Sequence, residues 1–197
     1  LGVRQFNAES AASLARDSAG SARLRQQFLD AQAEGKIYDY EKEMYGETGF
    51  TTNSVITVSG GNERTGIFLS AANRQEDGII KKTGYTNRSV RMNLDHRATD
   101  GIKLSLSTNY IYSSSDRGVT GNDNAGVTYG IAMSSTPGFV DLHPDENGVY
   151  PRNPFAASNF LETRDKVINN EQVNRFITGV TLDATLQRSP ASITRLV

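Results

Sequence analysis

The sequence predicts an all-β fold, an antiparallel meander with a short helical segment before it and a long irregular loop within it. Between Thr52 and Ser115, four runs alternate apolar and polar residues with period two. This pattern is typical of strands with two different faces. Two connections, Gly60 to Glu63 and Thr99 to Gly101, are short and contain glycine, as antiparallel hairpins do.

The alternation divides the strands into an apolar and a polar series. The apolar series is Ile56, Val58, Ile67, Leu69, Ala71, Val90, Met92, Leu94, Ile102, Leu104 and Leu106. The opposite series is Thr57, Ser59, Ser70, Arg91, Asn93, Asp95, Lys103, Ser105, Ser107 and Asn109. A soluble sheet with one hydrated face would show the same pattern. Long strands, tight turns at one end, long loops at the other and aromatic residues near strand ends favour a transmembrane β-barrel instead, and all four are present.

Composition limits the classes of protein that the chain could belong to. A net charge of −1 over 197 residues argues against a nucleic-acid partner, and the absence of cysteine excludes disulfides and thiolate metal sites. No apolar run approaches the roughly 20 residues of a membrane-spanning helix. Because barrel strands alternate, a mean hydropathy of −0.48 does not count against a barrel. The chain starts at Leu1 without a signal peptide and ends while still β-patterned, so we expect a fragment.

Residues 1–50 are expected to form a helical segment. Asn7 is a candidate N-cap for an Ala-rich helix, and Gly20 is expected to end that helix. A second helix over about 21–34 would end just before Gly35. Its buried stripe would consist of Leu24, Phe28 and Ala31.

Residues 51–197 carry the strand pattern. The predicted strands are about 52–59, 65–74, 85–97, 102–113 and 173–187. Since directly opposite residues share a face, the third connection must hold an odd number of residues, which fits residues 99–101 with a left-handed Gly101 last. Leu94 then faces Leu106. On the other face, Asp95 meets Ser105 and Asn93 meets Ser107.

Residues 114–171 form a long loop punctuated by glycine and proline. Such a long connection is usually functional or disordered. A short helix is expected within 125–135. Residues 145–148 (Asp-Glu-Asn-Gly) read as a turn rather than a calcium site, because their spacing differs from that of an EF-hand.

The sequence contains no catalytic constellation. The two histidines, His96 and His143, lie in different regions, and neither a nucleophile elbow nor a phosphate-binding loop is present. We therefore expect neither an enzyme nor a bound metal or cofactor.

The amino-acid sequence of residues 54–96 resembles that of a known family. The stretch SVITVSGGNERTGIFLSAANRQEDGIIKKTGYTNRSVRMNLDH resembles the first part of the barrel in the SusC/RagA family of TonB-dependent outer-membrane transporters. That family has a strand ending in SGGN, a strand and loop resembling NQEGIIKNTGY, and a strand resembling R-x-N-L-D. The later stretch TPGFVDLHPDENGVYPRNPFAASN is similar to a Pro-rich segment of the family.

The resemblance implies a fold, a location and partners. Residues 51–197 would form an arc of a large barrel of about 22 strands in the outer membrane of a Gram-negative bacterium. Residues 1–50 would belong to an extracellular loop. The whole transporter would import oligosaccharides or peptides with a SusD-like lipoprotein, driven by the TonB complex through parts absent here. No nucleic acid is implied. The alternative hypothesis is a soluble β-sandwich that binds carbohydrate.

A barrel assigns a role to each face and to the long loop. Lipid would contact Ile56, Val58, Ile67, Leu69, Val90, Met92, Leu94, Leu104, Leu106, Val180 and Leu182. The lumen would be lined by Arg91, Asn93, Asp95, Ser105, Ser107 and Asn109. An outer aromatic girdle would contain Phe50, Tyr85, Tyr110 and Tyr112, and substrate or partner would meet Tyr129, Phe139, Tyr150, Asn153 and Phe155.

Overall fold

The computed structural model describes residues 7–123, 125–189 and 192–196. The chain divides into two compact units, each built from several stretches of sequence. The sheet unit consists of Phe50–Glu76, Tyr85–Ser115 and Glu171–Val197. The loop unit consists of Leu1–Gly49, Asp77–Gly84 and Asp116–Asn170.

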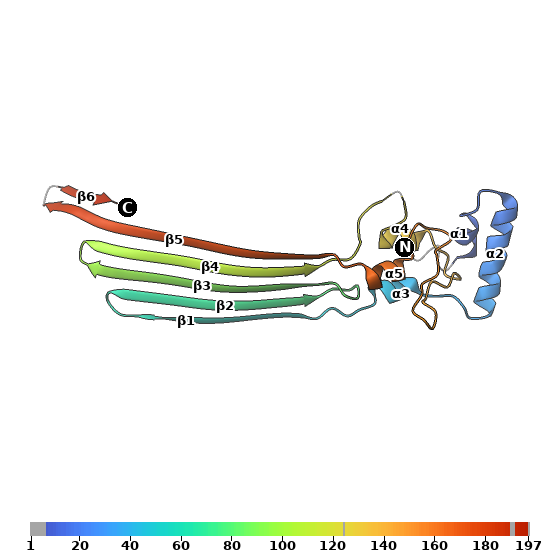
Figure 1. Ribbon diagram of the computed structural model, residues 1–197, viewed down its shortest axis with the longest axis horizontal. Coiled ribbons are helices and arrows are strands. Elements are labelled where there is room, and N and C mark those ends of the chain that lie inside the picture. Colours follow the sequence, from blue (N-terminus) through green and yellow to red (C-terminus); the bar gives the residue numbers. More distant parts are fainter. Residues whose placement is uncertain (1–6, 124, 190–191, 197) are drawn as a thin grey trace. The chain divides into compact units, whose positions relative to one another are not determined.

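The sheet unit is a six-stranded meander in which each strand pairs with the next along the chain (Figure 1). The strands are β1 (Thr51–Gly61), β2 (Thr65–Asp77), β3 (Gly84–Thr99), β4 (Ile102–Asp116), β5 (Asn170–Ser189) and β6 (Ser192–Leu196). All five predicted strands are confirmed, and each is longer than predicted. β6 was not predicted. Among the described residues, no helix is long and apolar enough to cross a membrane.

The register follows from parity, as predicted. Val58 lies opposite Leu69, and Thr57 lies opposite Ser70. Between β3 and β4, the Ser105 hydroxyl donates to Asp95 at 2.6 Å. The Ser107 hydroxyl donates to Asn93 at 3.0 Å, so both predicted cross-strand pairs are confirmed.

The predicted left-handed Gly101 is wrong. β3 continues through Thr99, and Gly101 is not among the residues with positive φ. The Gly101 N–H donates to Thr99 Oγ1 at 3.3 Å, and its carbonyl accepts the Thr185 N–H at 2.8 Å. A side chain and the neighbouring strand therefore hold this turn. The first turn is also tighter than predicted, because β1 runs through Gly61.

The loop unit contains five helices within its described residues. They are α1 (Ala8–Ala12), α2 (Ser18–Ala33), α3 (Tyr40–Tyr45), α4 (Tyr129–Ser134) and α5 (Phe160–Lys166). Asn7 caps α1 as predicted, since its Oδ1 accepts the N–H groups of Glu9 and Ser10. The predicted break at Gly20 is wrong. Asp17 Oδ1 accepts the Gly20 N–H at 2.6 Å, so Gly20 lies in the first turn of a helix that Asp17 caps.

The core of the loop unit joins three stretches of sequence that lie far apart. It consists of Tyr40, Met44, Ile80, Tyr129, Ala132, Met133, Leu142, Phe160 and Leu161. The long loop is therefore irregular in backbone but packed against α3. Its second helix, α5, was not predicted, although Asn159 accepts the N–H groups of Leu161 and Glu162 as an N-cap does.

Candidate functional site: a two-faced sheet and a packed loop unit

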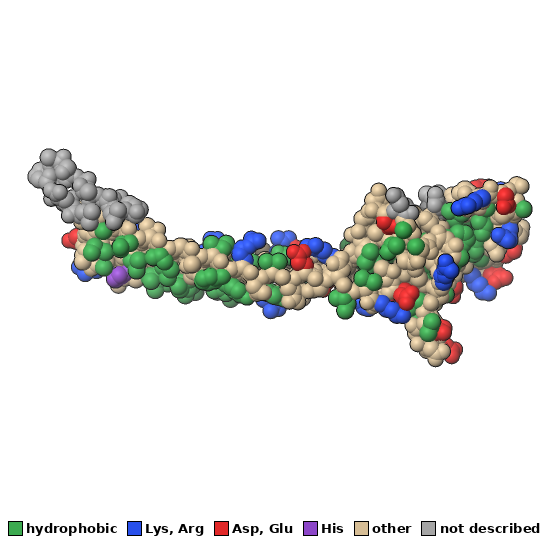
Figure 2. Space-filling model, turned by 45° about the horizontal axis from the view of Figure 1, so that its top comes forward, with side chains coloured by type: hydrophobic (Ala, Val, Ile, Leu, Met, Phe, Trp, Pro, Cys, Tyr) green, Lys and Arg blue, Asp and Glu red, His purple; other side chains and the backbone are tan. Residues whose placement is uncertain are grey.

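The apolar face of the sheet unit is open to its surroundings. Of its side chains, Ile56 is 71% exposed, Val58 is 61% exposed and Val180 is 67% exposed. Figure 2 shows hydrophobic side chains gathered along one side of the sheet. Soluble proteins rarely expose contiguous apolar patches of this kind unless the patch meets a membrane or a partner. At the hairpin end of this face, His96 Nδ1 lies 2.9 Å from Thr65 Oγ1.

The opposite face is polar and internally hydrogen-bonded. Besides the two serine contacts described above, Lys103 Nζ lies 3.1 Å from Asp95 Oδ1. A hollow of about 200 Å³ opens on this face. It is lined by Phe68, Ser70, Asn87, Ser89, Arg91, Asn109 and Ile111. The six residues expected to line a lumen thus share one face; that this face lines a lumen stays a prediction.

The expected aromatic girdle is wrong for one of its members. Phe50 is 68% exposed and Tyr110 is 44% exposed. The Tyr85 hydroxyl, however, accepts a hydrogen bond from Asn87 Nδ2 at 3.1 Å, and Asn87 lines the hollow on the polar face. Because Tyr85 shares the parity of Asn87, its ring lies on the face opposite Tyr110.

An aromatic and carboxylate cluster holds α3 against the loop. Tyr40 is fully buried, and its hydroxyl donates to the Val140 carbonyl at 2.6 Å while accepting the Leu142 N–H at 2.9 Å. The ring of His143 lies 5.8 Å from that of Tyr40. Its Nε2 lies 2.9 Å from Glu43 Oε2, a contact that spans 100 residues of sequence.

His143 is the titratable centre of this cluster. Its Nδ1 lies 2.8 Å from Asp141 Oδ1, so the ring bridges two carboxylates. Burial opposes protonation, but the hydrogen bonds and charges of Asp141 and Glu43 outweigh it and raise the pKa of His143. The sequence offered no signal for this bridge, because Glu43 and His143 are adjacent only in the folded chain.

The five residues expected to meet substrate or partner have different environments. Tyr129 and Asn153 are each only 3% exposed. Asn153 Nδ2 donates to Thr136 Oγ1 at 2.9 Å and to the Ser158 carbonyl at 3.0 Å. These contacts fix the loop.

The other three expected residues are partly accessible. Tyr150, Phe139 and Phe155 are half-buried. The Tyr150 hydroxyl donates to Asp165 at 2.6 Å, and this hydrogen bond is the main reason why the pKa of Tyr150 rises to about 12. Phe155 lines a hollow of about 620 Å³ beside Arg152 and Pro154. That it meets a substrate or partner stays a prediction.

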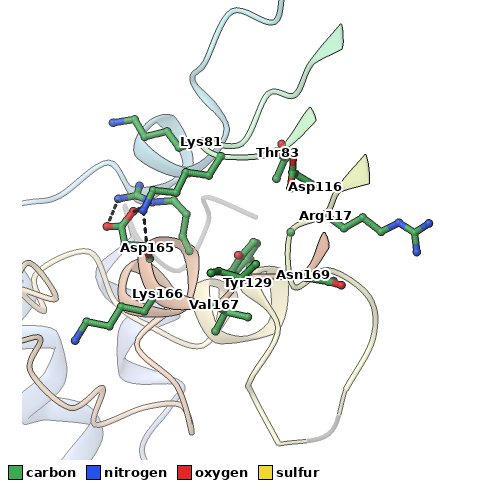
Figure 3. A pocket seen from close by; sticks show the side chains of 13 residues that line it. Lys81, Thr83, Asp116, Arg117, Tyr129, Asp165, Lys166, Val167 and Asn169 are labelled. Atoms are coloured by element: carbon green, nitrogen blue, oxygen red, sulfur yellow. Dashed lines mark hydrogen bonds and ion pairs between the residues drawn. The ribbon is translucent and has the colours of Figure 1, made fainter. Parts of the chain in front are cut away.

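A second pocket in the loop unit, of about 330 Å³, is rich in cations (Figure 3). At its centre, Asp165 receives a bidentate contact from Arg164 at 3.0 and 2.9 Å, and Lys82 Nζ donates to the Asp165 carbonyl at 2.7 Å. The side chains of Arg117 and Lys166 point in opposite directions. The cations therefore do not converge on one ligand, and the network joins α5 to residues 77–84.

The turn at residues 145–148 forms as predicted. Asp145 Oδ1 accepts the N–H groups of Asn147 and Val149, at 2.9 and 2.8 Å. Among the described residues, no group of three or more histidine or acidic side chains is placed to hold a metal ion.

Comparison with known proteins points to one class. The chain is 30% identical over 76 residues to TonB-dependent receptor P26 of Formosa agariphila. This match covers 39% of the chain and 8% of the receptor's length. No family model matches the chain. This partial similarity supports a relationship to the TonB-dependent receptors, which are transporters rather than enzymes.

The His143 bridge predicts how the stability of the loop unit depends on pH. Because the folded-state pKa of His143 is raised, the stabilisation is complete below the ordinary histidine pKa of about 6.5 and disappears as pH rises through the folded pKa. The effect should stay below about 1 kcal/mol, since the side chain is 37% exposed and its ion pairs are screened. The thermal unfolding midpoint, measured at a series of pH values from below about 6.5 upward, should fall as the pH rises through the folded-state pKa of His143. His143→Gln should flatten the trend, whereas the control His96→Gln should leave it; an unchanged trend in His143→Gln would contradict the bridge.

Proposed function

We propose that the chain is part of an outer-membrane TonB-dependent transporter and that its sheet unit is an arc of the transmembrane β-barrel. The exposed apolar face, backed by a hydrogen-bonded polar face, carries the proposal. Lipid is the medium in which such a face is stable, and the similarity to a TonB-dependent receptor gives independent support.

Strand length and pairing support a membrane-spanning role. The first five strands contain 11, 13, 16, 15 and 20 residues, and a tilted strand needs about 9–11 residues to cross the hydrocarbon core. An open sheet edge is not tolerated in lipid, so the rest of the barrel must pair with the edges of this sheet. A β-sandwich would instead need a second sheet over the apolar face, and the described residues form one sheet.

The finer assignment is to the SusC/RagA group, with a SusD-like lipoprotein partner and oligosaccharides or peptides as substrates. This assignment is supported by the sequence resemblance of residues 54–96 and by the lengths of the connections between the strands. The short turns at 62–64 and 100–101 would face the periplasm. The loop unit would then face the outside, where a lid protein or a bulky solute could reach Phe139 and Phe155.

The membrane assignment predicts opposite tolerance at two neighbouring positions of β4. Leu106→Arg would place a charge on the lipid face, at a cost of about 2–4 kcal/mol near the midplane. Ser107→Arg would place the same charge on the polar face and should be tolerated. The amount of folded protein in the outer membrane should fall sharply for Leu106→Arg alone. It is measured on gels of unheated samples, in which a folded barrel resists unfolding. Equal amounts of both variants would contradict the barrel.

The loop unit is proposed to contact the substrate or the lipoprotein partner, with Phe155 as an aromatic contact. Truncating a central aromatic contact typically costs more than 1 kcal/mol, so Phe155→Ala should weaken solute uptake or co-purification of the partner about tenfold. The control Phe176→Ala makes the same change at an exposed position of the sheet. Both variants are normalised to the amount of protein in the membrane. Unchanged uptake and unchanged co-purification in Phe155→Ala would overturn this role.

A further inference from the structure

Two arginines lie close together on the polar face of the sheet unit. The Asn93–Ser107 contact at 3.0 Å sets the register that places Arg91 of β3 opposite Asn109 of β4. On the other side of β4, the Tyr110 hydroxyl donates to Asn174 at 2.7 Å. This contact brings the next residue, Arg175 of β5, alongside residues 109–111.

Both arginines point to the same side. Asn174 shares the apolar face with Tyr110, so Arg175 lies on the polar face with Arg91. Neighbouring strands are about 4.8 Å apart, and the backbones of Arg91 and Arg175, separated by β4, are therefore about 10 Å apart. Two arginine side chains can converge on one group across that distance.

The charges of these two side chains are not compensated within the described residues. There, neither guanidinium makes a hydrogen bond or an ion pair. Two other cations of the polar face do have partners: Arg74 pairs with Glu76, and Lys103 pairs with Asp95. The side chains next to Arg91 on its own face, Ser89 and Asn93, are neutral.

The hollow of about 200 Å³ beside Arg91 is lined with hydrogen-bond donors. Ser70, Ser89, Asn87 and Asn109 contribute hydroxyl and amide groups. A guanidinium offers donors in a planar fork that matches carboxylate, sulfate or phosphate oxygens. The size of the hollow suits one such group rather than a bulky solute.

We propose that Arg91 and Arg175, together with the hollow beside Arg91, form a binding site for an oxyanion carried by a solute. The site deepens the proposed transport function: if this face lines the passage, the passage favours solutes bearing a carboxylate, sulfate or phosphate over neutral ones. Asn109, between the two arginines, donates to the bound oxygen atoms.

Calorimetric binding to the intact, detergent-purified protein at low salt tests the site without requiring transport. Glucuronate, glucose 6-sulfate and glucose 6-phosphate serve as probes that distinguish the three oxyanions, and glucose serves as the neutral counterpart. At least one anionic sugar should bind, and glucose should not. The double variant Arg91→Gln/Arg175→Gln should lose at least about tenfold in affinity, a loss of 1.4 kcal/mol or more.

A matched control is available on the same strand. Arg97→Gln makes the same substitution with the same parity near the hairpin end of β3, and binding should survive it. Equal affinity of the double variant, or equal binding of glucose, would overturn the proposal. Failure of every probe to bind would overturn it as well. If the double variant then also lost thermal stability, an acidic segment of the intact protein would be the group that occupies the site between the two arginines. Because binding is measured in detergent, these results are separate from the Leu106→Arg membrane test.

Discussion

The structure depends on one constraint, the separation of apolar and polar side chains onto opposite faces of a long-stranded meander. Removing apolar surface from water is worth about 25 cal/mol per Å², yet the described residues leave Ile56, Val58 and Val180 more than 60% exposed. In water such a face would be covered by a second layer. In the proposed barrel, lipid would cover this face in place of a second layer, and the similarity to a TonB-dependent receptor agrees with that proposal.

The sheet could be predicted from the sequence because its determinants are local. Parity alone placed Asp95 beside Ser105 and Asn93 beside Ser107, and the structure confirms both. Turn details were less predictable. Gly101 was expected to be left-handed, but a hydrogen bond from β5 fixes the turn, and no pattern within the turn itself encodes that bond.

The loop unit was harder to predict because its determinants are distant in sequence. Glycines and prolines predicted a long irregular loop with one short helix, whereas Leu142 and Phe160 of that loop pack with Tyr40 in one core. The His143 bridge to Glu43 likewise joins residues 100 positions apart. Burial also divides the expected contact residues: Tyr129 supports the fold, while Phe155 remains accessible. Periodicity cannot reveal such differences, since they arise only when separate segments meet.

The claim that the apolar face meets lipid is tested most directly by spin-label accessibility along β4. The chain contains no cysteine, so single cysteines introduced at successive positions from Leu104 to Ile111 are its only labelling sites. They are labelled in the intact protein within a bilayer, after any cysteine outside this chain has been replaced by serine. Accessibility to oxygen, which concentrates in lipid, should peak at even positions such as Leu106. Accessibility to a water-soluble relaxation agent should peak at odd positions such as Ser107. The same accessibility to both agents at neighbouring positions, or water exposure of Leu106, would contradict the lipid-facing sheet.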